Sequence, residues 1–246
     1  MMKDKMLGII TTILLLVGCD SSDSGGLSFD VSGHWELSLR LVDFDENFES
    51  IANVVVDPEG RFMFTDGDFT AVGRNADSIK LNGSGVSLSS VGCFPDDGST
   101  TGFICDPESL DFEIVDANTL LASIEDTLLG VIEYRLQRLP QLDKAVAFSE
   151  LAGSWQSTAG TGSALVVNVD GSYRLVRFDG GEVEGNSAIA ANNIFTIDGA
   201  TTFGGEPVEV SGLGFVDAEG LLNIGVSAVV NGEIIATGDI FSFIEG

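Results

Sequence analysis

A short pattern occurs twice along the chain and limits the folds that the chain can adopt. It begins with Gly33-His34-Trp35 in the first copy and with Gly153-Ser154-Trp155 in the second. In each copy an extended apolar stretch follows, and then a turn, Asp57 to Gly60 in the first copy and Asp170 to Gly171 in the second. An aromatic residue follows the turn in both copies. The repetition indicates two related structural units in tandem.

The local pattern within each copy is that of β-strands. From Trp35 to Leu41 apolar residues alternate with polar ones, the period of a strand with one buried face. The 31 glycines, 5 prolines and 44% hydrophobic residues favour many short strands joined by turns. The sequence predicts an all-β fold of two tandem antiparallel meander barrels or flattened sandwiches, over residues 28–142 and 143–246. One or two helical turns are expected between Leu142 and Leu151, and a single β unit built from both copies is the alternative.

The N-terminus has the features of an export signal. Lys3 and Lys5 precede an apolar run that ends in Leu16-Val17-Gly18-Cys19. The run is too short to span a bilayer, which takes about 20 residues. This stretch resembles the lipobox of bacterial lipoproteins, which implies a signal peptide over 1–18, acylation of Cys19 and a flexible tether over 19–27. The resemblance implies a membrane-anchored protein of the cell envelope, and the position after Cys19 leaves the choice between inner and outer membrane open.

The charge of the chain restricts its partners. With 38 acidic and 11 basic residues the net charge is −27, which repels nucleic acid and anionic headgroups. The partners expected are therefore the membrane, through the lipid, and a protein or polymer of the envelope. The acidic segment from Asp43 to Glu49 resembles a calcium loop only superficially, because Phe48 stands at its sixth position and Val54 at its twelfth. No metal and no cofactor are expected, although a calcium-dependent surface remains an alternative.

Two cysteines remain when Cys19 is acylated. Cys93 and Cys105 bracket a loop that contains proline and glycine, and in an exported chain they most simply pair with each other. Closing so short a loop should contribute about 3 kcal/mol to stability.

A Gly-x-Trp that opens an antiparallel meander is similar to the start of the lipocalin-like families. In those families the tryptophan plugs one end of the barrel, and an arginine of the last strand packs across it. The resemblance implies that Arg135 or Arg138 lies over Trp35 through a cation–π contact. The second copy departs from the pattern, because no arginine follows Arg177 and Trp155 therefore lacks such a partner.

Catalytic signatures are weak. His34 is the only histidine, and strand parity predicts that it points away from Trp35, toward solvent. No Gly-x-Ser-x-Gly elbow or phosphate-binding loop is present. Parity also directs Arg177 to an interior, where its charge needs a carboxylate partner from the protein or from a ligand.

These observations favour a lipid-anchored, non-catalytic binding or interaction module with no ligand-binding residue identified. The first alternative is a carrier of a small apolar ligand in a barrel lumen, and the second is a carboxylate-dependent hydrolase. A cavity of roughly 300 Å3 or more would favour the carrier. Copies of this size leave little room beyond their own side chains, so we expect a filled interior.

Overall fold

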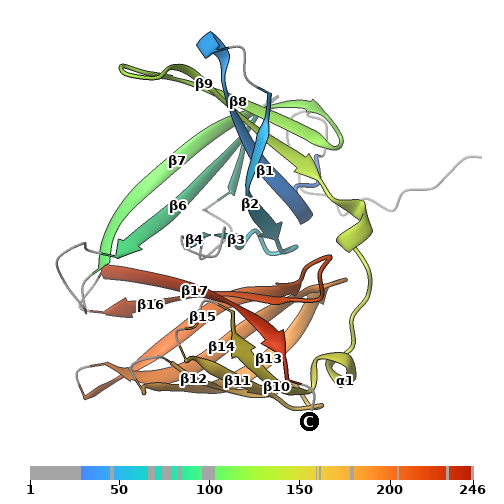
Figure 1. Cartoon of the computed structure of the whole chain (residues 1–246), viewed down its shortest axis with the longest axis vertical. Coiled ribbons are helices and arrows are strands. Elements are labelled where there is room, and N and C mark those ends of the chain that lie inside the picture. The colour runs from blue at the N-terminus through green and yellow to red at the C-terminus, as the bar shows by residue number, and fades with distance from the viewer. Residues whose placement is uncertain are drawn as a thin grey trace, which may run out of the picture.

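The computed structural model describes residues 29–44, 47–65, 70–73, 79–82, 85–95, 103–158, 160, 162–177, 180–203, 205–230 and 233–244 (Figure 1). The strands of the first β unit are β1 (Gly33–Leu41), β2 (Glu49–Val56), β3 (Phe62–Thr65), β4 (Thr70–Gly73), β5 (Ile79–Asn82), β6 (Gly85–Pro95), β7 (Phe103–Asp116), β8 (Thr119–Asp126) and β9 (Gly130–Arg138). Those of the second β unit are β10 (Gly153–Ser157), β11 (Ala164–Val167), β12 (Ser172–Val176), β13 (Glu182–Ala191), β14 (Ile194–Phe203), β15 (Glu206–Val216), β16 (Leu222–Val230) and β17 (Glu233–Phe243).

The first β unit is one antiparallel sheet with the strand order β4-β3-β2-β1-β9-β8-β7-β6-β5. Its first strand pairs with its last, with Trp35 opposite Arg138 and Leu41 opposite Ile132. A short pairing of β4 with β6 brings the two ends of the sheet together. The short strand β5 pairs with another part of β6, which makes it an addition to the meander.

The second β unit is a closed barrel, in which β10 to β17 follow one another around the ring. It closes where β10 pairs with β17, with Trp155 opposite Phe243. Because each unit joins its own first strand to its own last strand, the prediction of two tandem antiparallel β units is confirmed. A single unit built from both copies is not what forms.

Each unit packs its own core from the alternate side chains of its strands. The core of the first contains Trp35, Leu37, Phe112 and Leu136. The core of the second includes Trp155 and Phe241. The inward positions follow the predicted period of two, because successive strand side chains point to opposite faces.

A third apolar cluster joins the two units. It contains Val55 and Met63 from the first unit and Ile194, Leu213 and Phe215 from the second. These residues lie on the outer faces of their sheets, and the cluster buries them between the units. In Figure 1 the first unit lies above the second, with β15 to β17 on the side of the second that faces it.

His34 lies at this junction, so the prediction that it faces solvent is wrong. The residue is 1% exposed, and its ring contacts that of Phe215 edge-on, with 5.4 Å between ring centroids. Strand parity is correct in turning His34 away from Trp35. The outer face that it occupies is covered by the second unit, and parity within one sheet carries no information on that contact.

The segment between the units contains two short helical elements, η3 (Pro140–Leu142) and α1 (Phe148–Leu151). α1 confirms the helical turn expected before Gly153. A further 3-10 turn, η1 (Val42–Phe44), follows β1. No helix in the described part of the chain is long and apolar enough to cross a membrane.

Candidate functional site

Both tryptophans of the repeated pattern are held in the same way. The indole Nε1 of Trp35 donates to the carbonyl of Val31 at 2.9 Å, and that of Trp155 donates to the carbonyl of Leu151 at 2.9 Å. The acceptor is four residues earlier in each copy, and both side chains are buried. The hydrogen bond offsets the cost of burying the indole N–H at the start of each unit.

An arginine of the last strand lies over Trp35. The Arg138 guanidinium carbon is 4.4 Å from the indole ring, in the geometry of a cation–π contact. The same guanidinium donates to the carbonyl of Ser32 at 2.6 Å and to that of Asp30. The predicted contact with Trp35 is therefore confirmed for Arg138. Arg135 instead lies over Phe48, 4.3 Å from its ring centroid.

Phe243 replaces this arginine in the second unit. It pairs with Trp155 in the register position that Arg138 holds opposite Trp35. The two rings meet edge-on at 80°, with centroids 5.1 Å apart. Gly153 is needed here, because its φ is +147° and a Cβ atom would lie 2.5 Å from the Phe243 ring. The edge of the Phe243 ring thus covers Trp155 in the second unit, where the sequence offers no arginine for this position.

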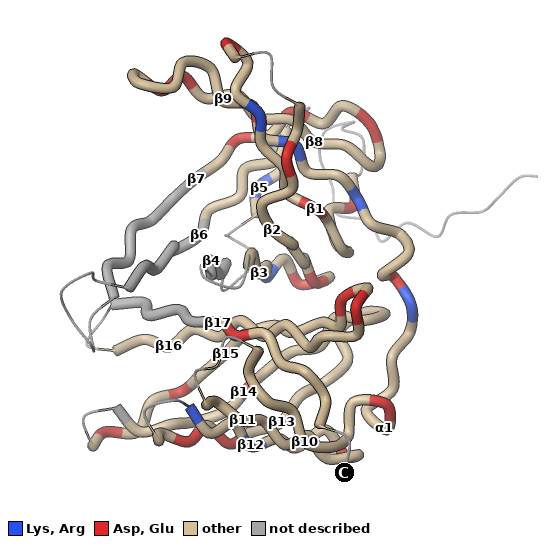
Figure 2. Tube along the Cα trace, viewed as in Figure 1, with Lys and Arg blue, Asp and Glu red and all other residues tan. Residues whose placement is uncertain are grey.

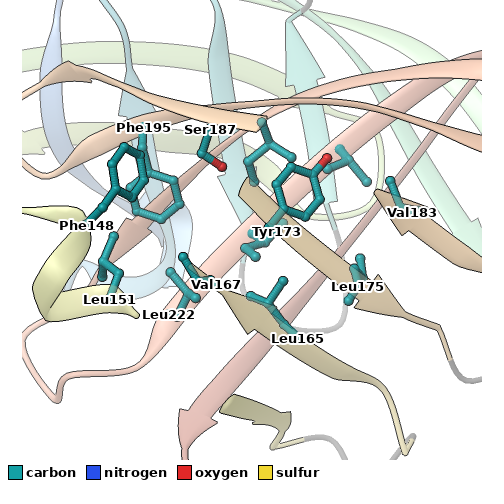
Figure 3. Close-up of a pocket in the computed structure, with 13 residues that line it drawn as sticks. Phe148, Leu151, Leu165, Val167, Tyr173, Leu175, Val183, Ser187, Phe195 and Leu222 are labelled. Carbon is teal, nitrogen blue, oxygen red and sulfur yellow. The ribbon is translucent and has the colours of Figure 1, made fainter. Parts of the chain in front are cut away.

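A pocket lies in the interior of the second barrel, which we call the lumen (Figure 3). Its lining is apolar except for Tyr173 and Ser187, and Phe148 and Leu151 of α1 contribute to it. The cavity volume is about 20 Å3. This is room for about one water molecule, so the expectation of a filled interior is confirmed for this unit.

Tyr173 provides a polar hydroxyl group among the apolar side chains that line the lumen. Its side chain is buried, and its hydroxyl has no hydrogen-bond partner in the structure. Burial, aided by the charge of Asp198, raises the pKa of Tyr173 to about 12. The hydroxyl therefore stays protonated at physiological pH and can donate one hydrogen bond to a water or to a small acceptor in the lumen.

The aspartates of the repeated turns are structural. One oxygen of Asp57 accepts from the backbone N–H groups of Glu59 and Arg61, and the other accepts from the Arg61 guanidinium at 2.7 Å. Asp170 accepts from the backbone and the hydroxyl of Ser172, which lowers the pKa of Asp170. Gly60 and Gly171 adopt φ values of +81° and +85°, which glycine tolerates best. These hydrogen bonds and backbone conformations shape the two turns.

The cysteine predictions fall largely outside the described residues. Cys19 lies outside them, as do the side chains of Cys93 and Cys105. The backbone register of β6 and β7 places Cys93 directly opposite Cys105. Directly opposed strand positions have Cα separations of about 4.5–5.5 Å, which a disulfide can span. The Cys93–Cys105 bridge stays a prediction.

The acidic segment after β1 is only partly described. Asp43 is in η1, and its carboxylate accepts from the backbone N–H of Val131 at 3.3 Å, while residues 45 and 46 lie outside the description. Among the described residues no group of three or more histidine, cysteine or acidic side chains is placed to hold a metal ion.

The two arginines of β12 and its end differ in their surroundings. Arg174 is exposed and pairs with Glu182 and, at 3.6 Å, with Glu184. Arg177 follows β12 and is half-buried, and its backbone N–H donates to the carbonyl of Gly181 at 2.8 Å. Neither arginine lines the lumen cavity.

Compared with models of known families, with curated proteins and with solved structures, the chain shows no match.

Proposed function

We propose that the protein is a lipid-anchored protein of the cell envelope and a non-catalytic binding module that acts through its outer surface. The observation that carries the proposal is the filled lumen of the second barrel. A cavity of about 20 Å3 is far smaller than the roughly 300 Å3 typical of a small-molecule site. Binding in the lumen would require the packed side chains to move apart, whereas the outer surface is available without rearrangement.

The N-terminal sequence and the charge support the same proposal. An acyl anchor at Cys19 would hold the two units close to a bilayer, and stable anchoring takes two or more chains. The net charge of −27 gives the outer surface a strong field that favours cationic partners.

A hydrolase that uses two carboxylates is disfavoured by the lining of the lumen. Such an enzyme needs two carboxylate side chains that point into the same substrate-binding cavity. The residues around the cavity of the second barrel include no aspartate and no glutamate.

The carrier of a small apolar ligand is retained as the second candidate because of Tyr173. A buried hydroxyl without a partner costs about 1–3 kcal/mol, which a ligand with one hydrogen-bond acceptor would recover. Such a ligand would need the apolar lining and this one donor, and both are present in the lumen.

The anchor is tested by growth with labelled palmitate. The wild-type chain should incorporate the label, and Cys19→Ser should not. Label in the variant, or none in the wild type, would remove the anchor from the proposal.

The choice between module and carrier is tested by titration with N-phenyl-1-naphthylamine, a neutral apolar dye. The proposal predicts no saturable binding. Binding of one dye per chain that is lost in the lumen-filling variant Ser187→Phe, but kept in the surface variant Val169→Ser, would favour the carrier. Val169 is a suitable control because it is exposed and lies in the same unit.

A further inference from the structure

One end of the first unit presents apolar side chains to solvent. They belong to η1 and to the hairpin of β8 and β9. Leu128 is 90% exposed and Phe44 is 60% exposed, and Val42, Ile124 and Leu129 are exposed as well. We call these five residues the apolar tip. In Figure 1 η1, the short blue coil, and the turn between β8 and β9 both lie at the upper end of the first unit, away from the second unit.

The two parts of the apolar tip are fixed to each other. The carboxylate of Asp43, in η1, accepts from the backbone N–H of Val131, in β9. Gly130 lies against the same carboxylate, since a Cβ atom added there would be 1.9 Å from Asp43 Oδ2. Asp126 accepts from the backbone N–H groups of Leu128 and Leu129 at 2.8 and 2.9 Å. The exposed leucines are thus carried on a turn with defined hydrogen bonds, which reduces the entropy lost on binding.

Acidic residues lie next to the apolar tip along the chain. Asp43 is within η1, and Glu125 and Asp126 come shortly before the exposed leucines, separated from Leu128 by Thr127. The two backbone hydrogen bonds to Asp126 lower its pKa, which favours the charged form of its carboxylate. Arg40 is the nearest base along β1, and it already pairs with Glu133. Figure 2 shows the acidic segments at this end of the first unit.

These charges argue against two occupants. A second copy of the chain would bring the same acids and the same net charge of −27, and an anionic bilayer surface would also be repelled. The apolar tip also lies at the far end of β1 from the first described residue. The described chain begins at Phe29, which packs against Trp35 near the start of β1, whereas η1 follows the end of that strand. A nine-residue strand is about 30 Å long, so the tip lies about a strand length away from Phe29.

We propose that the apolar tip is a docking site for a protein segment that carries apolar side chains flanked by lysine or arginine. The leucines and Phe44 supply the apolar contact, and Asp43, Glu125 and Asp126 select a cationic partner through charge complementarity. This inference deepens the proposed function, because it assigns the outer surface of the module to one end of the first unit.

The test uses two fluorescein-labelled synthetic peptides, one of leucine and lysine and one of leucine and glutamate, with fluorescence anisotropy as the readout. The probe protein is the mature chain with Cys19→Ser. The leucine–lysine peptide should bind, and the double variant Leu128→Ser/Leu129→Ser should weaken binding at least tenfold. The matched control Val115→Ser/Val169→Ser removes two exposed apolar side chains elsewhere and should leave the affinity within twofold.

Several results would overturn the proposal. One is equal affinity of the leucine–lysine peptide for the wild type and the tip variant, which would show binding by net charge alone. Another is equal binding of the leucine–glutamate peptide.

Sedimentation of the wild type as a dimer that Leu128→Ser/Leu129→Ser dissociates would assign the tip to a second copy. Binding to phosphatidylcholine vesicles lost in the same variant would assign it to a membrane. If the peptide does not bind the apolar tip, the outcome of the dye titration is unaffected. The two experiments therefore distinguish a failure of this inference from a failure of the proposed function.

Discussion

Acidification should weaken the protein through His34. The residue is 1% exposed, and neither ring nitrogen has a hydrogen-bond partner in the structure. Burial lowers the pKa of His34 from 6.5 to about 4. The folded protein therefore holds this ring neutral between these two pH values, where the unfolded chain protonates it.

The sign and size of the effect follow from this difference. Because the unfolded state binds the extra proton, the free energy of unfolding is highest above pH 6.5 and falls as the pH is lowered toward 4. The loss is about 2 kcal/mol at pH 5 and about 3 kcal/mol at pH 4. Asp143, whose carboxylate accepts from the backbone N–H of His34, has a pKa raised by burial and so acts in the opposite direction.

The assay is urea unfolding at pH 7 and pH 5, followed by the fluorescence of Trp35 in a Trp155→Phe background. Comparison with His34→Phe isolates the histidine, since the chain has no other. The wild type should lose about 2 kcal/mol more than the variant between the two pH values. The variant should be as stable as the wild type at pH 7 or more so, because two unpaired polar atoms are removed. Equal losses in the two proteins would refute the reasoning.

Three further predictions concern the interiors of the two units. Arg138→Ala should destabilise the first unit by about 2–3 kcal/mol, since it removes the contact with Trp35 and two charge-assisted hydrogen bonds. Urea unfolding followed by Trp35 fluorescence measures the free energy of unfolding, and a loss below about 1 kcal/mol would contradict the prediction. Tyr173→Phe should leave the second unit unchanged or stabilise it by about 1 kcal/mol in thermal unfolding, because the hydroxyl is unpaired; a clear loss would show that the hydroxyl has a partner in solution. Gly185→Ala should lower the stability of the second unit by more than about 2 kcal/mol, because the new Cβ atom would lie 2.0 Å from the carbonyl oxygen of Asp198. Thermal unfolding followed by circular dichroism measures this loss, and an unchanged melting temperature would show that the two strands move apart at no cost.

The repeated pattern was enough to predict the fold class, because its residues perform the same task in both units. Trp35 and Trp155 each bond to a carbonyl four residues earlier, and both pair with the last strand of their own unit. Period-two alternation indicated which side chains face the interior. It could not reveal that Phe243 takes the position of Arg138, since the two residues share neither charge nor a local motif.

The contact between the units was missed, although the sequence contained a signal for it. Val54, Val55 and Val56 form a continuous apolar run, and Leu213 and Phe215 add apolar side chains to the outer face of β15. A strand that is apolar on both faces is buried on both faces. His34 lies on the same outer face as Val55, so this signal would have placed the histidine in an interface rather than in solvent.

The size of the lumen could not be derived from the sequence. It depends on how Phe148, Tyr173 and Phe195 fill the barrel, and on glycines that admit them. Gly214 is one example, because a Cβ atom there would lie 2.3 Å from the Phe195 ring. Such contacts join residues far apart in the chain, and no local pattern reports them.

The central claim is that the barrel interior is filled by its own side chains and that binding takes place outside. Native mass spectrometry of the mature chain, released gently from membranes, tests it most directly. The account predicts the mass of the acylated chain, two hydrogens lighter for the Cys93–Cys105 bridge, with no small molecule retained. A retained apolar compound that is released on unfolding and absent from Ser187→Phe would contradict the claim.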